Sequence, residues 1–111
     1  MAAKYVLSKS TDDKFYFNLK AGNHEVILTS QMYADKGGAT NGIESCRKNG
    51  VVDGQFERKT AKDGSPFFSL NATNGQIIGK SEMYKSEAAR DNGIESVKKN
   101  AADAELKDKT A

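Results

Sequence analysis

The residues best suited to metal, acid–base or nucleophilic chemistry are few and scattered in this sequence. It has one histidine, His24, and one cysteine, Cys46. A structural zinc site needs four nitrogen or sulfur ligands, and a nucleophilic cysteine needs a neighbouring histidine to activate it. His24 lies in a predicted turn and is interpreted as a surface residue. Cys46 falls on the apolar stripe of a predicted helix and is interpreted as a small buried side chain. We therefore expect no metal, no cofactor and no catalytic cysteine.

Two carboxylates, Glu44 and Glu95, recur at matching positions and would suit general acid–base catalysis if they came together. They belong to two different predicted helices and point away from the apolar stripe of each, so a solvated surface is the better interpretation. The glycine-containing segment 35–38 does not have the spacing of a phosphate-binding loop. An enzyme would need a cleft with a shifted titratable group, and the sequence favours a non-enzymatic protein.

The remaining candidate chemistry is aromatic and cationic. Two strand-like segments place an aromatic side chain on the face opposite their apolar residues, and three basic residues are expected nearby. This candidate binding surface comprises Tyr16, Phe67, Lys14, Lys20 and Arg58. Aromatic rings flanked by cations on a sheet are a chemistry that stacks nucleobases. The alternative is that Tyr16 and Phe67 only pack against side chains of neighbouring strands.

An internal duplication provides the elements that must position these residues. A shift of 51 positions aligns residues 4–50 with residues 55–101 without a gap. The longest match is Asn-Gly-Ile-Glu-Ser, at residues 41–45 and 92–96. Repetition at a fixed period determines the fold, so we expect one domain, 1–111, made of two repeats, 4–53 and 54–108.

Each repeat reads as three strands followed by a helix. Apolar residues alternate over 14–20 and 66–70, and short turns containing asparagine and glycine join them to apolar runs at 25–29 and 76–80. Period-two alternation predicts strands, and such turns predict hairpins.

The helices have recognisable beginnings and an unusual interior. Asp35 and Ser86 are suited to accept hydrogen bonds from the first free N–H groups of each helix. Gly42 and Gly93 lie inside the helices, where glycine costs roughly 0.5–1 kcal/mol relative to alanine. We infer a close backbone contact at both positions.

The segments around Phe56 and Leu106 indicate how the halves combine. Residues 53–57, at the start of the second repeat, are similar to residues 103–107, so we expect a further strand after the second helix. A short hairpin with one helix is marginal alone. We predict an α+β fold, a tandem βββα repeat plus a C-terminal strand. It forms a single, mostly antiparallel sheet with both helices on one face and an approximate two-fold axis. The strand at Phe56 is expected to connect the halves.

Three segments resemble the YegP-like family: residues 15–21, residues 26–30 with Tyr33, and above all residues 92–100, Asn-Gly-Ile-Glu-Ser-Val-Lys-Lys-Asn. The resemblance covers residues 4–108. It implies an α+β fold in which strand-strand-strand-helix-strand units, carried singly or in tandem, exchange their last strands. It implies no activity and assigns no site residue.

Composition limits the class of protein but not its partner. The chain is 37% hydrophobic and 29% charged, with a net charge of +2, too small to argue for nucleic acid by itself. No apolar run could span a membrane, and the single cysteine agrees with a reducing compartment, so we expect a cytoplasmic protein. The leading hypothesis is a small binding or interaction module. Self-association, a protein partner and nucleic acid on the sheet face all stay open, and no membrane partner is expected.

Overall fold

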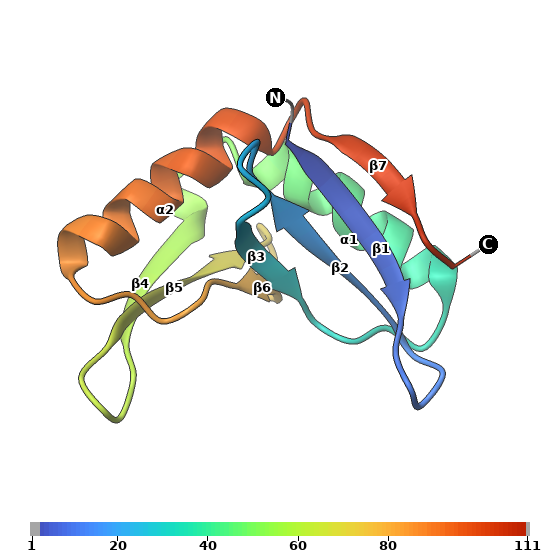
Figure 1. Ribbon diagram of the computed structural model, residues 1–111, viewed down its shortest axis with the longest axis horizontal. Coiled ribbons are helices and arrows are strands. Elements are labelled where there is room, and N and C mark those ends of the chain that lie inside the picture. The colour runs from blue at the N-terminus through green and yellow to red at the C-terminus, as the bar shows by residue number, and fades with distance from the viewer. Residues whose placement is uncertain (1–2, 111) are drawn as a thin grey trace.

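Seven strands form one mixed sheet, and two helices lie on the same face of it (Figure 1). The computed structural model describes residues 3–110. The strands are β1 Lys4–Lys9, β2 Phe15–Lys20, β3 Val26–Ser30, β4 Phe56–Thr60, β5 Pro66–Asn71, β6 Ile77–Lys80 and β7 Glu105–Asp108. The helices are α1 Lys36–Asn49 and α2 Glu87–Asn100, with a short 3-10 helix at Asp53–Gln55. The predicted α+β fold, a tandem βββα repeat with a final strand, is confirmed.

The strand order across the sheet is β4-β5-β6-β3-β2-β1-β7. Neighbouring strands are antiparallel except β1 and β7, which are parallel. At the centre, β3 meets β6 with Thr29 opposite Lys80. Because position 29 corresponds to position 80 under the shift of 51, the approximate two-fold axis passes through this pair.

The two repeats are joined through strands and helices. Strand β7, at the end of the second repeat, pairs with β1 of the first. Helix α1 contacts β2 of its own repeat and also β5 and β6, while α2 contacts β5 and also β3. Each helix therefore covers strands from both halves.

The strand at Phe56 does not connect the halves as the sequence predicts. Residues Asp53–Gln55 form the 3-10 helix, and β4 begins at Phe56. Within residues 3–110, β4 pairs with β5 alone and lies at the sheet edge. Strand β4 is the first strand of the second repeat, as β1 is of the first. The described part of the chain has only one further strand, β7, and because β7 pairs with β1, no strand there is left to pair with the outer side of β4.

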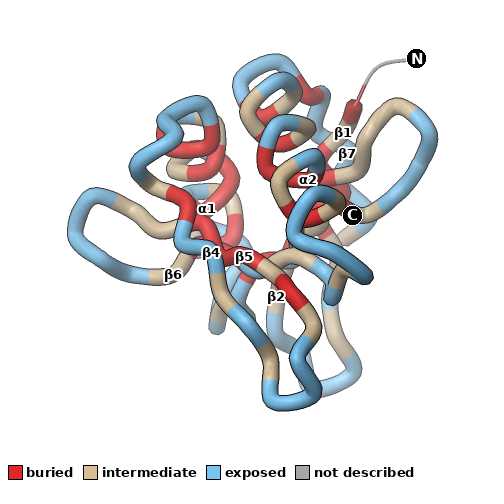
Figure 2. The backbone as a smooth tube through the Cα atoms, turned by 90° about the vertical axis from the view of Figure 1, so that its left-hand side faces the viewer, coloured by how far each residue is buried: buried red, intermediate tan, exposed pale blue. Residues whose placement is uncertain are grey.

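The hydrophobic core lies between the sheet and the helices. Phe17 and Phe68, at equivalent positions in β2 and β5, are buried in one cluster with Ile43 and Ile94 of the helices. Each phenylalanine also meets an aromatic ring of the neighbouring strand edge-on, with centroids 5.8 and 5.6 Å apart, a favourable arrangement. Figure 2 shows buried segments where helices meet strands and exposed turns elsewhere. The predicted packing of these strands on the helices is confirmed.

Both helices begin at the predicted residues. Asp35 Oδ1 accepts a hydrogen bond from the Gly38 N–H at 2.7 Å, and Ser86 Oγ accepts one from the Ala89 N–H at 3.1 Å. Each bond satisfies an N–H that has no partner within its helix. Neither helix within residues 3–110 has the length and apolar character needed to cross a membrane.

The helix glycines are explained by side chains rather than by the backbone contact we inferred. A Cβ on Gly42 would collide with the Tyr33 hydroxyl and lie 2.8 Å from its Cζ and 3.0 Å from the Phe17 ring. A Cβ on Gly93 would meet Tyr84 in the same way. Each glycine thus leaves room for a tyrosine that follows the third strand of its repeat.

Candidate functional site

The sheet face opposite the helices, here called the open face, carries a row of seven residues, one from each strand, and all except Val6 are polar. The register places these residues side by side, in the order Lys107, Val6, Asn18, Thr29, Lys80, Ser69 and Glu57. Asn18 Nδ2 donates to Thr29 Oγ1 at 2.9 Å. The centre of the open face therefore offers hydrogen-bonding groups, with Lys80 exposed among them.

Tyr16 and Phe67 both lie on the open face, and both are partly buried. Tyr16 is opposite Ser8 and Phe67 is opposite Lys59 in the ladders. Their strands, β2 and β5, are separated by β3 and β6, which sets the strand axes about 14 Å apart. Figure 1 shows the β1–β2 and β4–β5 hairpins diverging, with their turns on opposite sides of the molecule. The two aromatic residues therefore form two separate patches.

The three predicted basic residues occupy different places. Lys14 is exposed beside the turn between β1 and β2, and Lys20 lies on the open face opposite Lys4. Arg58 does not belong to this face, which corrects the prediction. It is opposite Phe68 in register, on the helix side, and its Nε lies 3.1 Å from Asp91 Oδ1 of α2. Strand alternation assigns Arg58 to the same face as Phe56, the one buried residue of β4.

A half-open cavity of about 280 Å³ lies at the β7 end of the open face. We call it the lysine pocket, and it is lined by Lys4, Val6, Lys20, His24, Lys107, Asp108 and Lys109. Among the basic residues of the predicted binding surface, only Lys20 lies in this pocket. Lys4 is opposite Lys20 in the β1–β2 ladder, whereas Lys107, Asp108 and Lys109 join them only because β7 pairs beside β1. The similarity of residues 103–107 to residues 53–57 predicted a strand at the C-terminal end, but it did not indicate which strand would pair with it.

The lysines of this pocket have no acidic partner. Within residues 3–110, no carboxylate oxygen forms an ion pair with Lys4, Lys20, Lys107 or Lys109. Asp108, which also lines the pocket, pairs instead with Lys36 of α1 at 2.5 Å. The hydrogen bonds from Lys36 and Thr110 lower the pKa of Asp108 to about 2. The pocket is therefore strongly cationic.

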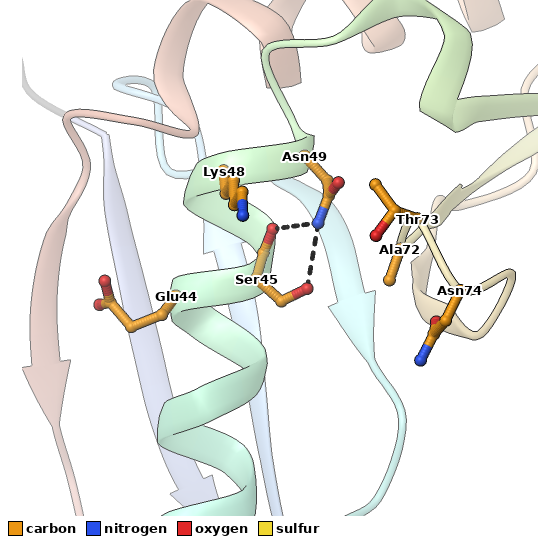
Figure 3. A pocket seen from close by; sticks show the side chains of 7 residues that line it. All are labelled: Glu44, Ser45, Lys48, Asn49, Ala72, Thr73 and Asn74. Atoms are coloured by element: carbon orange, nitrogen blue, oxygen red, sulfur yellow. Dashed lines mark hydrogen bonds between the residues drawn. The ribbon is translucent and has the colours of Figure 1, made fainter.

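A second cavity, of about 400 Å³, lies on the helix side between α1 and the β5–β6 turn (Figure 3). Its lining consists of Glu44, Ser45, Lys48, Asn49, Ala72, Thr73 and Asn74. Apart from Thr73, every lining residue recurs 51 positions away in the other repeat.

The recurrence of these cavity residues in both repeats has a structural explanation. Asn49 Nδ2 donates to the Ser45 carbonyl at 2.9 Å and to its Oγ at 3.1 Å, and Asn100 bonds Ser96 in the same way. These bonds tie the last residue of each helix back to the preceding turn. Glu44 pairs with Arg47 and is exposed, as predicted. We assign no ligand to this cavity.

Apart from Asp108, the large pKa shifts belong to Cys46 and Tyr5, which are buried in the core. Burial raises the pKa of the Cys46 thiol to about 11, and burial also raises the pKa of Tyr5. The Tyr5 hydroxyl donates to the Ala101 carbonyl at 2.6 Å. His24 is exposed and has a φ of 70°, at the position where the second repeat has Gly75. Across residues 3–110, no three metal-ligating side chains gather in one place.

Comparison with known proteins gives a family and a fold. Residues 10–57 and 61–108 each match the family described as "Domain of unknown function (DUF1508)". A UPF0339 protein of Bordetella pertussis is 58% identical over 106 residues, 96% of each chain.

Two solved structures resemble this one closely. The solution NMR structure of a UPF0339 protein from Shewanella oneidensis is 53% identical, with a TM-score of 0.91 over 97% of this chain and 92% of its own. The NMR structure of YegP from Escherichia coli is 48% identical, with a TM-score of 0.93 over 98% and 94%. The predicted resemblance is confirmed, and these names assign neither a reaction nor a ligand.

Proposed function

This chain belongs to the DUF1508 family, and on that premise we propose that it is a small binding module that holds single-stranded nucleic acid on the open face of its sheet. The family brings no assigned activity, so the proposal depends on the face itself. Its main support is that the lysines of the pocket have no acidic partner, whereas most ion pairs involve the helices or the turns.

Two kinds of group on the open face suit a single strand. Unpaired lysines attract the phosphate backbone, and this attraction is the main source of affinity for any sequence. Tyr16 and Phe67 offer ring faces that stack bases, each worth about 1–3 kcal/mol by alanine substitution. Because the two rings are in separate patches, a strand that reaches both would gain avidity from their linkage.

Other functions have less support. Self-association through a sheet edge is disfavoured because both edge strands carry charges, Glu57 and Arg58 on β4 and Glu105 and Lys107 on β7. Catalysis is disfavoured because the raised pKa values of Cys46 and Tyr5 belong to buried groups, and the lowered pKa of Asp108 is explained by its hydrogen bonds with Lys36 and Thr110. We propose that the protein is not an enzyme and that it works in the cytoplasm, where a free thiol stays reduced.

The test is fluorescence anisotropy of labelled oligo(dT) and oligo(U) over a range of salt concentrations. We expect affinity to fall as salt rises, and Tyr16→Ala and Phe67→Ala to weaken binding by about 1–3 kcal/mol each. Tyr16→Phe keeps the ring face and should bind as the parent does. Lys99→Gln, which removes one exposed charge from the helix side, is the control that should leave affinity unchanged. Binding that ignores both salt and the two aromatic substitutions would overturn the proposal.

A further inference from the structure

We infer that the lysine pocket binds a terminal phosphate, the phosphomonoester at the end of a nucleic-acid strand. This inference rests on the proposed function and specifies it. A phosphomonoester carries a charge of about −1.5 to −2 at neutral pH, against one charge for a backbone phosphodiester. A pocket that gathers several lysines favours the group with the higher charge.

The register brings the lysine side chains together on three adjacent strands. Lys4 of β1 is directly opposite Lys20 of β2, and Lys107 of β7 is beside Val6 of β1. Val6 is only 6% exposed and closes the base of the pocket with an apolar side chain. Like charges opposite each other on a sheet destabilise it, and a bound anion would remove that cost.

Acidic groups near the pocket do not neutralise it. Asp108 is held by Lys36 on the far side of β7, and Glu105, although beside Lys4 in register, forms no ion pair with it. Because neither carboxylate pairs with a pocket lysine, these lysines are free to bind an external anion.

The second repeat has no counterpart of this pocket. The equivalents of Lys4, Val6, Lys20 and His24 are Gln55, Glu57, Asn71 and Gly75. Glu57 and Asn71 hydrogen-bond each other at 3.3 Å, so those groups are already satisfied. The duplicated face therefore has one cationic end, and a strand lying on it would be oriented with its phosphorylated end at β7.

The experiment compares one oligo(dT) sequence with a 5′-phosphate, a 3′-phosphate or hydroxyl ends, by anisotropy. Inorganic phosphate and thymidine monophosphate serve as competitors, which separates a strand end from a free phosphate. We expect one phosphorylated form to bind roughly tenfold more tightly than the hydroxyl form. Lys107→Gln should abolish this preference, and because Lys107 is an exposed residue of β7 this substitution leaves the core intact.

Two further variants guard against a misfolded protein. His24→Gly removes the imidazole, and the second repeat already has glycine with positive φ at that turn, so the backbone is not disturbed. It should reduce the preference for the phosphorylated form. Lys99→Gln removes an equal charge on the helix side and should preserve that preference.

The outcomes separate the two proposals. Equal affinity for phosphorylated and hydroxyl strands would overturn the terminal-phosphate site and leave the proposed function standing. If no strand binds, the proposed function fails. In that case an NMR titration with inorganic phosphate tests whether the pocket binds an anion. Chemical-shift changes confined to Lys4, Lys20 and Lys107 would support an anion site there, and the absence of such changes would overturn it.

Discussion

Cys46 illustrates how a single side chain depends on the core around it. It is fully buried on α1, and its equivalent in α2 is Val97, which is also fully buried. Thiolate, not thiol, is the reactive form of cysteine. Since burial holds the thiol neutral, Cys46 should resist thiol reagents at about pH 8 until the protein unfolds, as a structural cysteine does.

The same burial makes stability fall in alkali. Well below pH 9.0 the thiol is protonated in the folded and unfolded states alike, so it adds no pH dependence there. Above pH 9.0 the unfolded chain loses the proton while the folded protein keeps it until about pH 11, so the free energy of unfolding decreases across this interval. Urea unfolding should show a loss of roughly 2 kcal/mol for this group. Cys46→Ala, measured at the same pH values, should lack that part of the slope. An identical slope would contradict the assignment.

Individual residues were predictable where a local rule governs them, as at Asp35, Ser86 and Cys46. Arg58 also follows a local rule, because alternation along β4 places it on the same face as buried Phe56, where the structure has it. Lys107 does not follow from any local rule: it is 103 positions from Lys4, and only the β1–β7 pairing brings the two residues together.

At the scale of elements, each helix packs closely on the segment after the third strand of its repeat, as α1 does on Tyr33. Gly42→Ala would add a Cβ where the Tyr33 hydroxyl and the Phe17 ring already lie. Alanine improves helix propensity by roughly 1 kcal/mol, but overpacking a buried site costs about 1–3 kcal/mol. We expect net destabilisation, measured by thermal or urea unfolding, with Tyr33 displaced from the helix.

Two controls separate this clash from a general effect of alanine. Gly54→Ala adds the same group where no atom lies within 4 Å, and it should leave stability nearly unchanged. Tyr33→Phe removes the colliding hydroxyl, so Gly42→Ala should cost less in that background. If Gly42→Ala stabilises the protein as its helix propensity alone would suggest, the packing explanation is wrong.

The elements themselves followed from periodicity, turn residues and caps, and all seven strands and both helices were expected. What periodicity cannot give is adjacency. The strand order places β4 at one edge and β7 beside β1. Both positions depend on contacts between residues far apart in sequence.

At the scale of the whole molecule, the two-fold axis through Thr29 and Lys80 shows what one repeat lacks. Half of the sheet leaves β3 or β6 unpaired on one side, and the helix of each half covers strands of the other. A small unit in this state buries too little apolar surface to be stable alone. The single-domain prediction then requires one cooperative unfolding transition for the intact chain.

A fragment of residues 1–60 provides the sharpest test of this dependence. It retains β1, β2, β3 and α1, and its residues 53–57 correspond to β7 at an offset of 50. Two copies could pair their β3 strands about the axis, with Thr29 opposite Thr29, and each lend the segment around Phe56 to the other's β1. We expect sedimentation and circular dichroism to show a folded dimer that dissociates and unfolds together on dilution. Thr29→Lys would place two lysines on the axis and weaken the dimer by roughly 0.2–1 kcal/mol. A fragment that folds as a monomer would contradict the requirement for a second repeat, and one that stays unfolded at every concentration would contradict the symmetric pairing.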